Sequence, residues 1–344
     1  MAKPSRAPAK GPPVTDPVLD IVAIGNAIVD VIARADEALL ARHALAKGSM
    51  RLIDAPMAER LYADMGPALE ISGGSAANTL AGMAALGGRC GFIGQVRDDQ
   101  LGAVFAHDMR ALGIHFETAP APDGPPTARC LILVTPDGQR TMNTYLGASQ
   151  SLPTAALDLA MIRAARILYL EGYLWDPAQP RTAMRTAIAT AREAGREIAF
   201  TLSDAFVIDR HRADFRALIT DGLIDILFAN EAEIRALAET DDIEKAIAAM
   251  APGVRMLVVT RGENGAIAMR DGLRYECPAA PVTTLVDTTG AGDLFAAGFL
   301  TGYVRGKDVA HCLQMGALAA AEIISHYGAR PERDLKQVLG PLLR

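Results

Sequence analysis

Short apolar runs alternate with longer helical patterns over the second half of the chain. The runs ARILYLEG, EIAFTLS, DILFAN and MLVVTRG are separated by such patterns, the first over 177–195. Apolar runs bounded by turn residues are typical of buried strands, and their alternation with helices favours a parallel sheet flanked by helices. The pattern therefore predicts a doubly wound α/β fold with a parallel central sheet, closed by helices over 291–304 and 308–326.

The first half of the chain adds strands of a different kind. LDIVAIGNAIVDVIA (19–33) reads as two strands joined at Gly25-Asn26, and 128–148 reads as a hairpin that turns at Pro136-Asp137-Gly138. Residues 34–72 show short mixed patterns with an amphipathic helix near 55–69. We predict a small β-rich lid built from two separated segments, 34–72 and 115–148, on an α/β domain formed by 18–33, 73–114 and 149–344.

Composition narrows the function classes. The 344 residues are 50% hydrophobic and carry a formal net charge of −6, which favours neither a nucleic-acid partner nor a membrane span. Residues 1–17 are rich in proline and cations without an apolar run behind them, so we expect a disordered tail rather than a signal peptide. Four scattered cysteines, Cys90, Cys130, Cys277 and Cys312, indicate reduced thiols and a cytoplasmic location.

Several common catalytic motifs are missing from the sequence. It contains no G-x-x-x-x-G-K-[ST] loop, no G-x-G-x-x-G fingerprint and no G-x-S-x-G elbow. A Walker-type nucleotide site is excluded on this basis, and an NAD-dependent enzyme or an acyl-transfer hydrolase is disfavoured.

The stretch Thr289-Gly290-Ala291-Gly292-Asp293 is the strongest candidate for chemistry. Small side chains before a helix let an anion approach backbone N–H groups that have no partner inside the helix. Asp293 is either a helix cap or a base, and a cap does not need three small residues before it. Phosphoryl transfer uses both a base and anion-binding donors, which would be Asp293 and the N–H groups of residues 290–292.

Three motifs resemble one known family. DTTGAGD (287–293), GGSAANTLAGMAALGG (73–88) and FANEAE (228–233) are similar, in order and spacing, to signatures of the ribokinase family, the PfkB carbohydrate kinases. The resemblance covers about residues 19–335 and implies a ribokinase-like fold, ATP and Mg²⁺ as cofactors, and phosphorylation of an alcohol. GNAIVD (25–30) brings the chain nearest to adenosine kinases and related nucleoside kinases, whose expected partners are a nucleoside and ATP.

The resemblance implies substrate contacts in four regions. Asp30 and Asn78 would bind ribose hydroxyls, and Arg140 would lie on the lid over the site. Ala77 stands where animal adenosine kinases usually have glutamine, which puts the nucleobase in doubt. The full set of implied substrate-binding residues is Asn26, Ile28, Asp30, Gly73, Gly74, Asn78, Arg140 and Tyr173.

The resemblance also implies an ATP side, formed by Asn230, Thr260, Gly262, Thr289 and Gly292. Glu233, with Asn230, would organise Mg²⁺ through water, although the same pair could form a capping box. A monovalent cation such as K⁺ could bind carbonyl groups of the VDTTG stretch, and the chain could be a monomer or a dimer.

Alternatives stay open at this point. Tyr173 and Trp175 could stack on a purine or pack in the core, and His326 and Tyr327 could border adenine or be structural. The leading hypothesis is phosphorylation of the 5′-hydroxyl of a ribonucleoside, most of all adenosine. The alternatives are a kinase for ribose, fructose or a sugar acid, a guanosine or inosine kinase, and a catalytically silent binding protein on the same fold.

Overall fold

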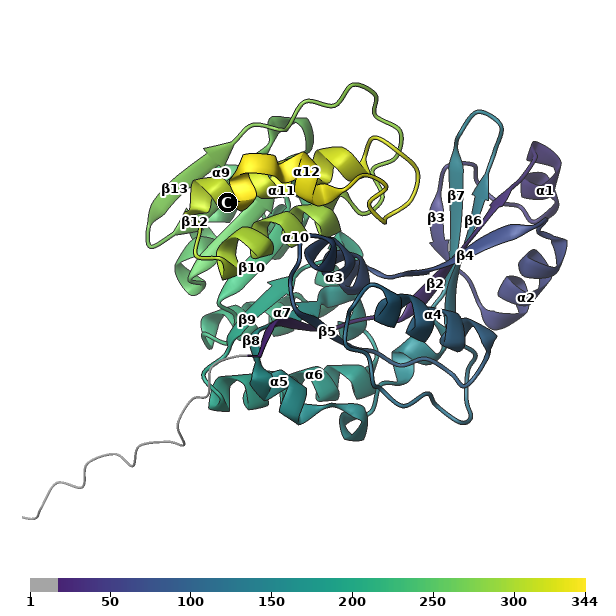
Figure 1. Ribbon diagram of the computed structural model, residues 1–344, viewed down its shortest axis with the longest axis horizontal. Helices are drawn as coiled ribbons and strands as arrows, with labels where there is room; N and C mark the ends of the chain where they lie inside the picture. The colour runs from purple at the N-terminus through teal and green to yellow at the C-terminus, as the bar shows by residue number, and fades with distance from the viewer. Residues whose placement is uncertain (1–17) are drawn as a thin grey trace, which may run out of the picture.

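The computed structural model describes residues 18–344, so the predicted tail, residues 1–17, lies outside the described part of the chain. An eight-stranded sheet forms the centre of the larger domain (Figure 1). Its strands, in spatial order, are β13 (Leu273–Cys277), β12 (Ala266–Arg270), β11 (Met256–Thr260), β10 (Ile226–Asn230), β9 (Glu197–Thr201), β8 (Ala165–Glu171), β1 (Leu19–Ile24) and β5 (Cys90–Ile93).

This sheet is parallel over most of its width, as expected, and is extended at one edge by a hairpin that makes it mixed. The six strands from β11 to β5 are parallel, whereas β12 and β13 run antiparallel at one edge. Only Asp271 and Gly272 join β12 to β13, and both have positive φ. A two-residue turn can connect antiparallel strands only, because parallel strands need a long crossover.

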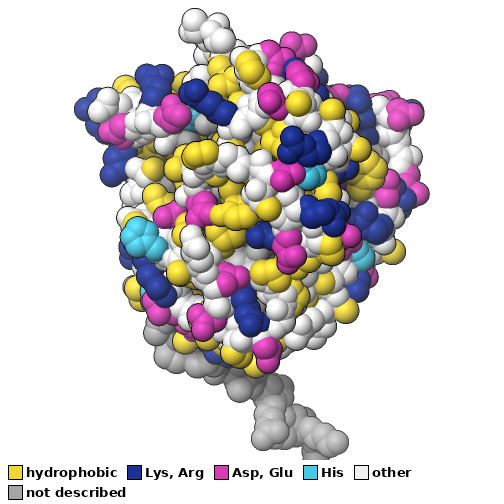
Figure 2. Space-filling view, turned by 90° about the vertical axis from the view of Figure 1, so that its right-hand side faces the viewer, with side chains coloured by type: hydrophobic (Ala, Val, Ile, Leu, Met, Phe, Trp, Pro, Cys, Tyr) yellow, Lys and Arg dark blue, Asp and Glu magenta, His cyan; other side chains and the backbone are white. Residues whose placement is uncertain are grey.

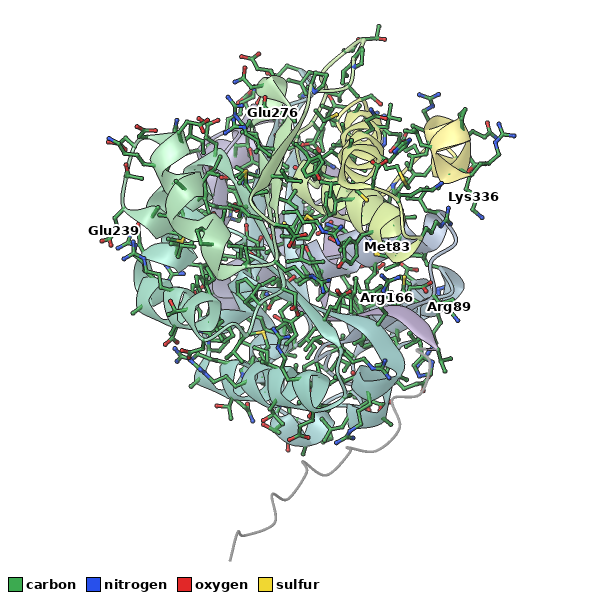
Figure 3. The ribbon with its side chains drawn as sticks, turned by 90° about the vertical axis from the view of Figure 1, so that its left-hand side faces the viewer. Met83, Arg89, Arg166, Glu239, Glu276 and Lys336 are labelled. Atoms are coloured by element: carbon green, nitrogen blue, oxygen red, sulfur yellow. The ribbon has the colours of Figure 1, made fainter. Side chains whose placement is uncertain are left out.

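Helices cover both faces of the sheet, so the doubly wound architecture is confirmed. Alternate residues of β1 point into two separate hydrophobic cores. Ile21 and Ala23 belong to the first core, and Val22 and Ile24 belong to the second. The first core includes α3 (Ser75–Ala85), α10 (Ala291–Val304), α11 (Val309–Ile323) and α12 (Leu335–Leu339). Figure 3 shows Met83 of α3 beside these C-terminal helices. The second includes α5 (Leu159–Ala164), α6 (Ala178–Glu193), α7 (Ala205–Thr220), α8 (Glu231–Ala238) and α9 (Ile243–Met250).

A second, five-stranded sheet forms the lid (Figure 1). Its order is β3 (Met50–Leu52), β7 (Arg140–Tyr145), β6 (Ala128–Val134), β2 (Ile28–Arg34) and β4 (Ala68–Gly73). Alternate positions such as Val29, Val31, Leu131 and Leu133 are buried together with residues of α1 (Glu37–Arg42), α2 (Ala55–Asp64) and α4 (Gln100–Ala111). The opposite face of the sheet carries Ile28 and Asp30 and lies over the larger domain.

The lid has other bounds than the sequence suggested. Strand β2, which we expected at the end of the domain's first segment, pairs with β4 and β6 in the lid sheet. The predicted helix near 55–69 ends at Asp64, and Ala68–Gly73 is a strand. Residues 115–127 contain no strand and contact the large sheet through the bridges Gly91–His115 and Arg97–Ala121. The predicted hairpin of 128–148 is confirmed, with β6 and β7 antiparallel.

On the lid side of the molecule, cationic and anionic side chains are interspersed with hydrophobic ones (Figure 2). Within residues 18–344, none of the helices combines the length and the apolar character that a membrane crossing requires.

The contact between α10 and α11 gives a first testable prediction. A Cβ at Gly298 would lie 2.4 Å from the backbone oxygen of Met315, so Gly298→Ala must push the two helices apart. We expect the free energy of unfolding to fall by about 1–3 kcal/mol, as for other overpacked cores, despite the better helix propensity of alanine. Urea denaturation measures this, with Gly66→Ala as control because a Cβ there meets nothing within 4 Å. Equal stability of the two variants would contradict the close approach.

Candidate active site

A cavity of about 710 Å³ lies between the lid and the carboxyl ends of the parallel strands. Open α/β sheets bind ligands at this edge. The volume falls in the range of about 300–1,000 Å³ that is usual for small-molecule sites. Fourteen of the residues singled out in the sequence line the cavity: Asn26, Ile28, Asp30, Gly74, Asn78, Tyr173, Asn230, Glu233, Thr260, Thr289, Gly290, Ala291, Gly292 and Asp293.

Asp293 lies in the first turn of α10, directly behind the anion loop (residues 288–292). Gly290 has φ of 78° and begins the helix without a side-chain cap, so the first N–H groups keep no side-chain acceptor. The carboxylate of Asp293 does not cap the helix; it accepts hydrogen bonds from Ser75 Oγ (2.6 Å) and Asn78 Nδ2 (3.0 Å). Burial raises the pKa of Asp293, whereas these two hydrogen bonds and Arg330 oppose the shift. Asp293 therefore makes no capping hydrogen bond, although it is an acidic residue in the first turn of the helix.

Asp30 projects from the lid strand β2 onto the turn between β4 and α3. A Cβ at Gly73 would lie 2.6 Å from Asp30 Oδ2, and a Cβ at Gly74 would lie 2.3 Å from the backbone oxygen of Asn26. Two glycines are thus needed for this close approach, and Gly74 also has φ of 95°. Burial raises the pKa of Asp30 to about 6, and Asp293 acts in the same direction, while Arg330 and Arg140 oppose it.

Asn26 is tied inward by a carboxylate that the sequence analysis missed. Glu171, at the end of β8, is fully buried and accepts from Asn26 N (2.7 Å), Asn26 Nδ2 (2.8 Å) and Ala76 N (2.8 Å). Ser149 Oγ donates to Asn26 Oδ1 (2.8 Å), so the Asn26 amide is committed to the protein. Burial raises the pKa of Glu171 to about 7. A charged residue at the end of the apolar run ILYLEG was the available signal.

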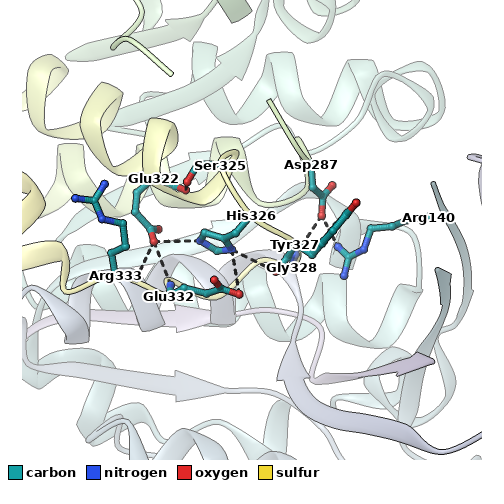
Figure 4. A network of polar contacts seen from close by, with 9 residues as sticks. All are labelled: Arg140, Asp287, Glu322, Ser325, His326, Tyr327, Gly328, Glu332 and Arg333. Atoms are coloured by element: carbon teal, nitrogen blue, oxygen red, sulfur yellow. Dashed lines mark hydrogen bonds and ion pairs between the residues drawn. The ribbon is translucent and has the colours of Figure 1, made fainter. Parts of the chain in front are cut away.

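Three predicted residues lie outside the cavity lining: Gly73, Arg140 and Gly262. Arg140 is buried and forms an ion pair with Asp287, and its guanidinium lies 5.5 Å from the ring centroid of Tyr327 (Figure 4). Asp287 also accepts from Thr289 N (3.0 Å) and Gly328 N (3.2 Å). Arg140 thus connects the lid to the anion loop.

The apolar wall of the cavity comes from both domains. Ile28, Leu52 and Ile132 belong to the lid, while Tyr173 and Phe206 face them from the larger domain. Phe206 was not predicted, and 74% of it is exposed at the start of α7. Trp175, by contrast, is fully buried and packs against Phe200 and Phe215, so the interpretation that it packs in the core is correct. His326 and Tyr327 are not among the lining residues; His326 Nε2 lies 3.1 Å from Glu322 Oε1.

Comparison with known proteins identifies the family. The profile of the "pfkB family carbohydrate kinase" matches residues 69–335. The chain belongs to this family.

Solved structures and curated relatives of this pfkB kinase differ in function. It is 47% identical to adenosine kinase from Sinorhizobium meliloti (TM-score 0.85, covering 93% of this chain and 98% of that one). It is 46% identical to a probable sugar kinase from Rhizobium etli CFN 42 (TM-score 0.86, 93% and 97% covered). An ATP-dependent ribose-1-phosphate kinase from Halopiger xanaduensis is 32% identical over 75% of this chain and 82% of its own. The protein is therefore a phosphotransferase with an alcohol acceptor, a nucleoside or sugar kinase.

Asn230 and Glu233 of this pfkB kinase form the capping box that the sequence allowed. Glu233 N donates to Asn230 Oδ1 (2.8 Å), while Asn230 N and Nδ2 donate to the Glu233 carboxylate at 2.9 and 2.6 Å. Both oxygens of Glu233 are therefore occupied, and burial raises its pKa to about 7. Residues 18–344 contain no cluster of three His, Cys, Asp or Glu side chains suited to a metal. The role of Glu233 in organising Mg²⁺ through water stays a prediction, since both of its carboxylate oxygens accept hydrogen bonds from Asn230.

The raised pKa of Asp30 predicts a pH dependence of stability. Folding favours protonated Asp30, because its pKa is raised in the folded state. The resulting contribution to the free energy of unfolding is complete below pH 3.8 and is lost as the pH rises through about 6. We expect Asp30→Asn to remove this contribution, so that the free energy of unfolding of the variant decreases less between pH 4 and 6 than that of wild type.

Urea denaturation across this pH range measures the difference. Asp241→Asn, which changes an exposed carboxylate, is the matched control and should follow wild type. Parallel curves for Asp30→Asn and wild type would show that burial does not perturb Asp30.

Proposed function

We propose that this pfkB kinase transfers the γ-phosphoryl group of ATP to the 5′-hydroxyl of adenosine and releases AMP and ADP. One observation supports this most directly: the Asp293 carboxylate lies beside an uncapped helix N-terminus and faces the same cavity as Asp30 and Asn78. The likeness to an adenosine kinase at 47% identity supports the nucleoside over other acceptors.

Asp293 would accept the proton of the 5′-hydroxyl as that oxygen bonds to the γ-phosphorus and the bond to the β-phosphate oxygen breaks. The raised pKa of Asp293 suits a base, because a more basic carboxylate accepts the proton more readily. N–H groups of residues 290–292 would stabilise the charge on the transferring group. Mg²⁺, when bound with ATP, supplies charge neutralisation of the phosphates.

The ribose would lie between Asp30 and Asn78. A carboxylate accepts two hydroxyl hydrogen bonds at once, which suits the 2′,3′-diol. Among the described residues, the buried Oδ1 of Asn78 has no hydrogen-bond partner. A buried acceptor without a partner is costly, so a substrate hydroxyl at this atom would stabilise the complex. Gly73 and Gly74 would keep this space open.

The apolar wall is the feature that favours a nucleoside over a free sugar. Ile28, Leu52 and Phe206 are apolar residues of the cavity lining, and a sugar alone offers no apolar group to them. A purine offers a planar face to Phe206 and Tyr173. The second candidate is a sugar kinase acting on ribose, fructose or a sugar acid, supported by the likeness to a probable sugar kinase at 46% identity. Guanosine and inosine are the remaining nucleosides.

On the ATP side, Asn230, Thr260, Thr289 and Gly292 line the cavity beside Glu233, and Gly262 follows the β11 end. A K⁺ site at the carbonyl groups of 286–290 would adjoin Asp287, whose carboxylate already has the Arg140 guanidinium as its counter-charge.

Turnover on a panel of substrates tests the proposal. ATP consumption with adenosine, guanosine, inosine, ribose and fructose, with and without Mg²⁺, should be fastest with adenosine and should require the metal ion. Turnover on a sugar alone would replace the nucleoside with the sugar alternative. No turnover on any member would favour the silent binding protein.

Replacement of the base should separate chemistry from binding. Asp293→Asn keeps the shape of the side chain but removes its basicity, so we expect kcat to fall by at least about 10²-fold while adenosine still binds. Initial rates and calorimetric titration measure the two effects. Asp271→Asn, in the exposed β12–β13 turn, is the control. A near wild-type kcat in Asp293→Asn would rule out Asp293 as the base.

Removal of the exposed aromatic ring tests the nucleobase wall. In Phe206→Ala, loss of stacking should raise the KM for adenosine about tenfold, which corresponds to about 1.4 kcal/mol. The KM for ribose, if ribose turns over, should not change. Leu273→Ala, an exposed residue outside the cavity, is the control. An unchanged adenosine KM would place the base elsewhere.

A further inference from the structure

Arg330 lies in the C-terminal loop (residues 324–334) that follows α11, and its guanidinium binds the turn between β4 and α3. Nε donates to the Ser72 carbonyl oxygen (2.9 Å), one terminal nitrogen to the Ala77 carbonyl oxygen (2.8 Å) and the other to Ser72 Oγ (3.0 Å). These contacts enclose the Gly73-Gly74 turn and the first turn of α3. Three fixed donors in one plane are a property of arginine that lysine does not share.

The same guanidinium is the positive charge between two site carboxylates. Asp30 and Asp293 both interact electrostatically with Arg330, and no nitrogen of Arg330 is within ion-pair distance of either in the described residues. Burial lowers the pKa of Arg330 to about 10, yet the side chain stays cationic at neutral pH. Its hydrogen bonds go to neutral oxygens, so its charge is not cancelled by a direct partner.

The surroundings of Asp293 show why this charge matters. Ser75 and Asn78 of α3 donate hydrogen bonds to Asp293. Its negative charge also raises the pKa values of surrounding acidic groups, which are Asp30 on β2, Tyr169 and Glu171 on β8, Tyr173 after β8, and Glu233 on α8. Apart from the two neutral donors, Arg330 is the group that favours ionised Asp293.

The C-terminal loop holds Arg330 in place through a buried carboxylate. Glu322 Oε1 accepts from Arg333 N (2.9 Å) and Glu332 N (3.1 Å) and lies 3.1 Å from His326 Nε2 (Figure 4). Gly328 N in the same loop donates to Asp287 behind the anion loop. One short loop thus contacts both the anion loop and the glycine turn.

From this geometry we propose that Arg330 is a positioning residue for phosphoryl transfer: it orients the α3 turn that presents Ser75 and Asn78 to Asp293, and its charge keeps Asp293 ionised. Arg330 touches neither the acceptor nor ATP in this role. The proposal rests on the proposed kinase function and on Asp293 as the base.

A pH profile separates the charge from a purely structural contribution. Removing a cation from the neighbourhood of a carboxylate raises the pKa of that carboxylate. In Arg330→Gln, the acid limb of kcat against pH should therefore move to higher pH, and the rate deficit relative to wild type should shrink as the pH rises. Arg330→Lys retains a charge but not the planar fork, so its acid limb should stay near wild type while the KM for adenosine increases.

Arg333→Gln is the matched control, because this neighbouring arginine is exposed and engages Glu322 through its backbone. A rate deficit of Arg330→Gln that is the same at every pH would overturn the proposal. If Arg330→Gln does not fold, the test is made with Arg330→Lys. An acid limb of kcat that moves to higher pH in Arg330→Lys, despite the retained charge, would also overturn the proposal. Wild type without turnover on any acceptor would instead refute the proposed function, so the two failures are distinguishable.

Discussion

The hydrogen bonds from Ser75 and Asn78 to the Asp293 carboxylate join the two halves of the site. These residues are more than two hundred positions apart in the chain, and they meet because α3 and α10 begin side by side. The helices approach closely at Gly82, where a Cβ would lie 2.7 Å from Leu294 and Ala297. Both helices start at a glycine turn, and at the start of α3 the Glu171 carboxylate accepts from Ala76 N. The helix packing therefore fixes the distance between the substrate turn and the base.

Electrostatics sets a second constraint. Burial raises the pKa values of Asp30, Glu171, Glu233 and Asp293, and bound ATP would add further negative charge nearby. Charges of one sign in a small volume are tolerated only with compensation. The protein supplies donors from backbone and amide groups, together with two arginines, of which Arg140 is buried and Arg330 is half-buried. Arg140 enters from the lid and Arg330 from the C-terminal loop, so the charge balance depends on segments outside the signature motifs.

This distribution explains what could be predicted from the sequence. The loop before α10 stood out by its local chemistry, because small residues there precede an acidic residue and a helix. Asp30 and Asn78 were singled out through the motifs that resemble the family. Glu171 and Arg330 were missed because each acts on backbone groups far away in the chain, which no local pattern reports. Strand β2 was assigned to the wrong sheet for a related reason. Its alternation of buried and accessible positions predicts a strand with one covered face, but the partner strands are set by the tertiary fold.

The cavity lining would offer the proposed substrate two kinds of contact. Near Asp293, hydroxyl groups would meet a carboxylate and an unpaired amide oxygen, and a ligand lacking such a hydroxyl leaves these atoms without partners. The apolar side chains of the wall, such as Leu52 and Phe206, distinguish ligands by size and shape more than by polar substituents, and Arg51, Asp204 and Arg210 add charged groups to the same lining. On the proposed function, the accepting hydroxyl would be specified more tightly than the rest of the substrate. Leu52 and Phe206 of the wall lie outside the motifs that resemble the family, whereas Ile28 lies within GNAIVD.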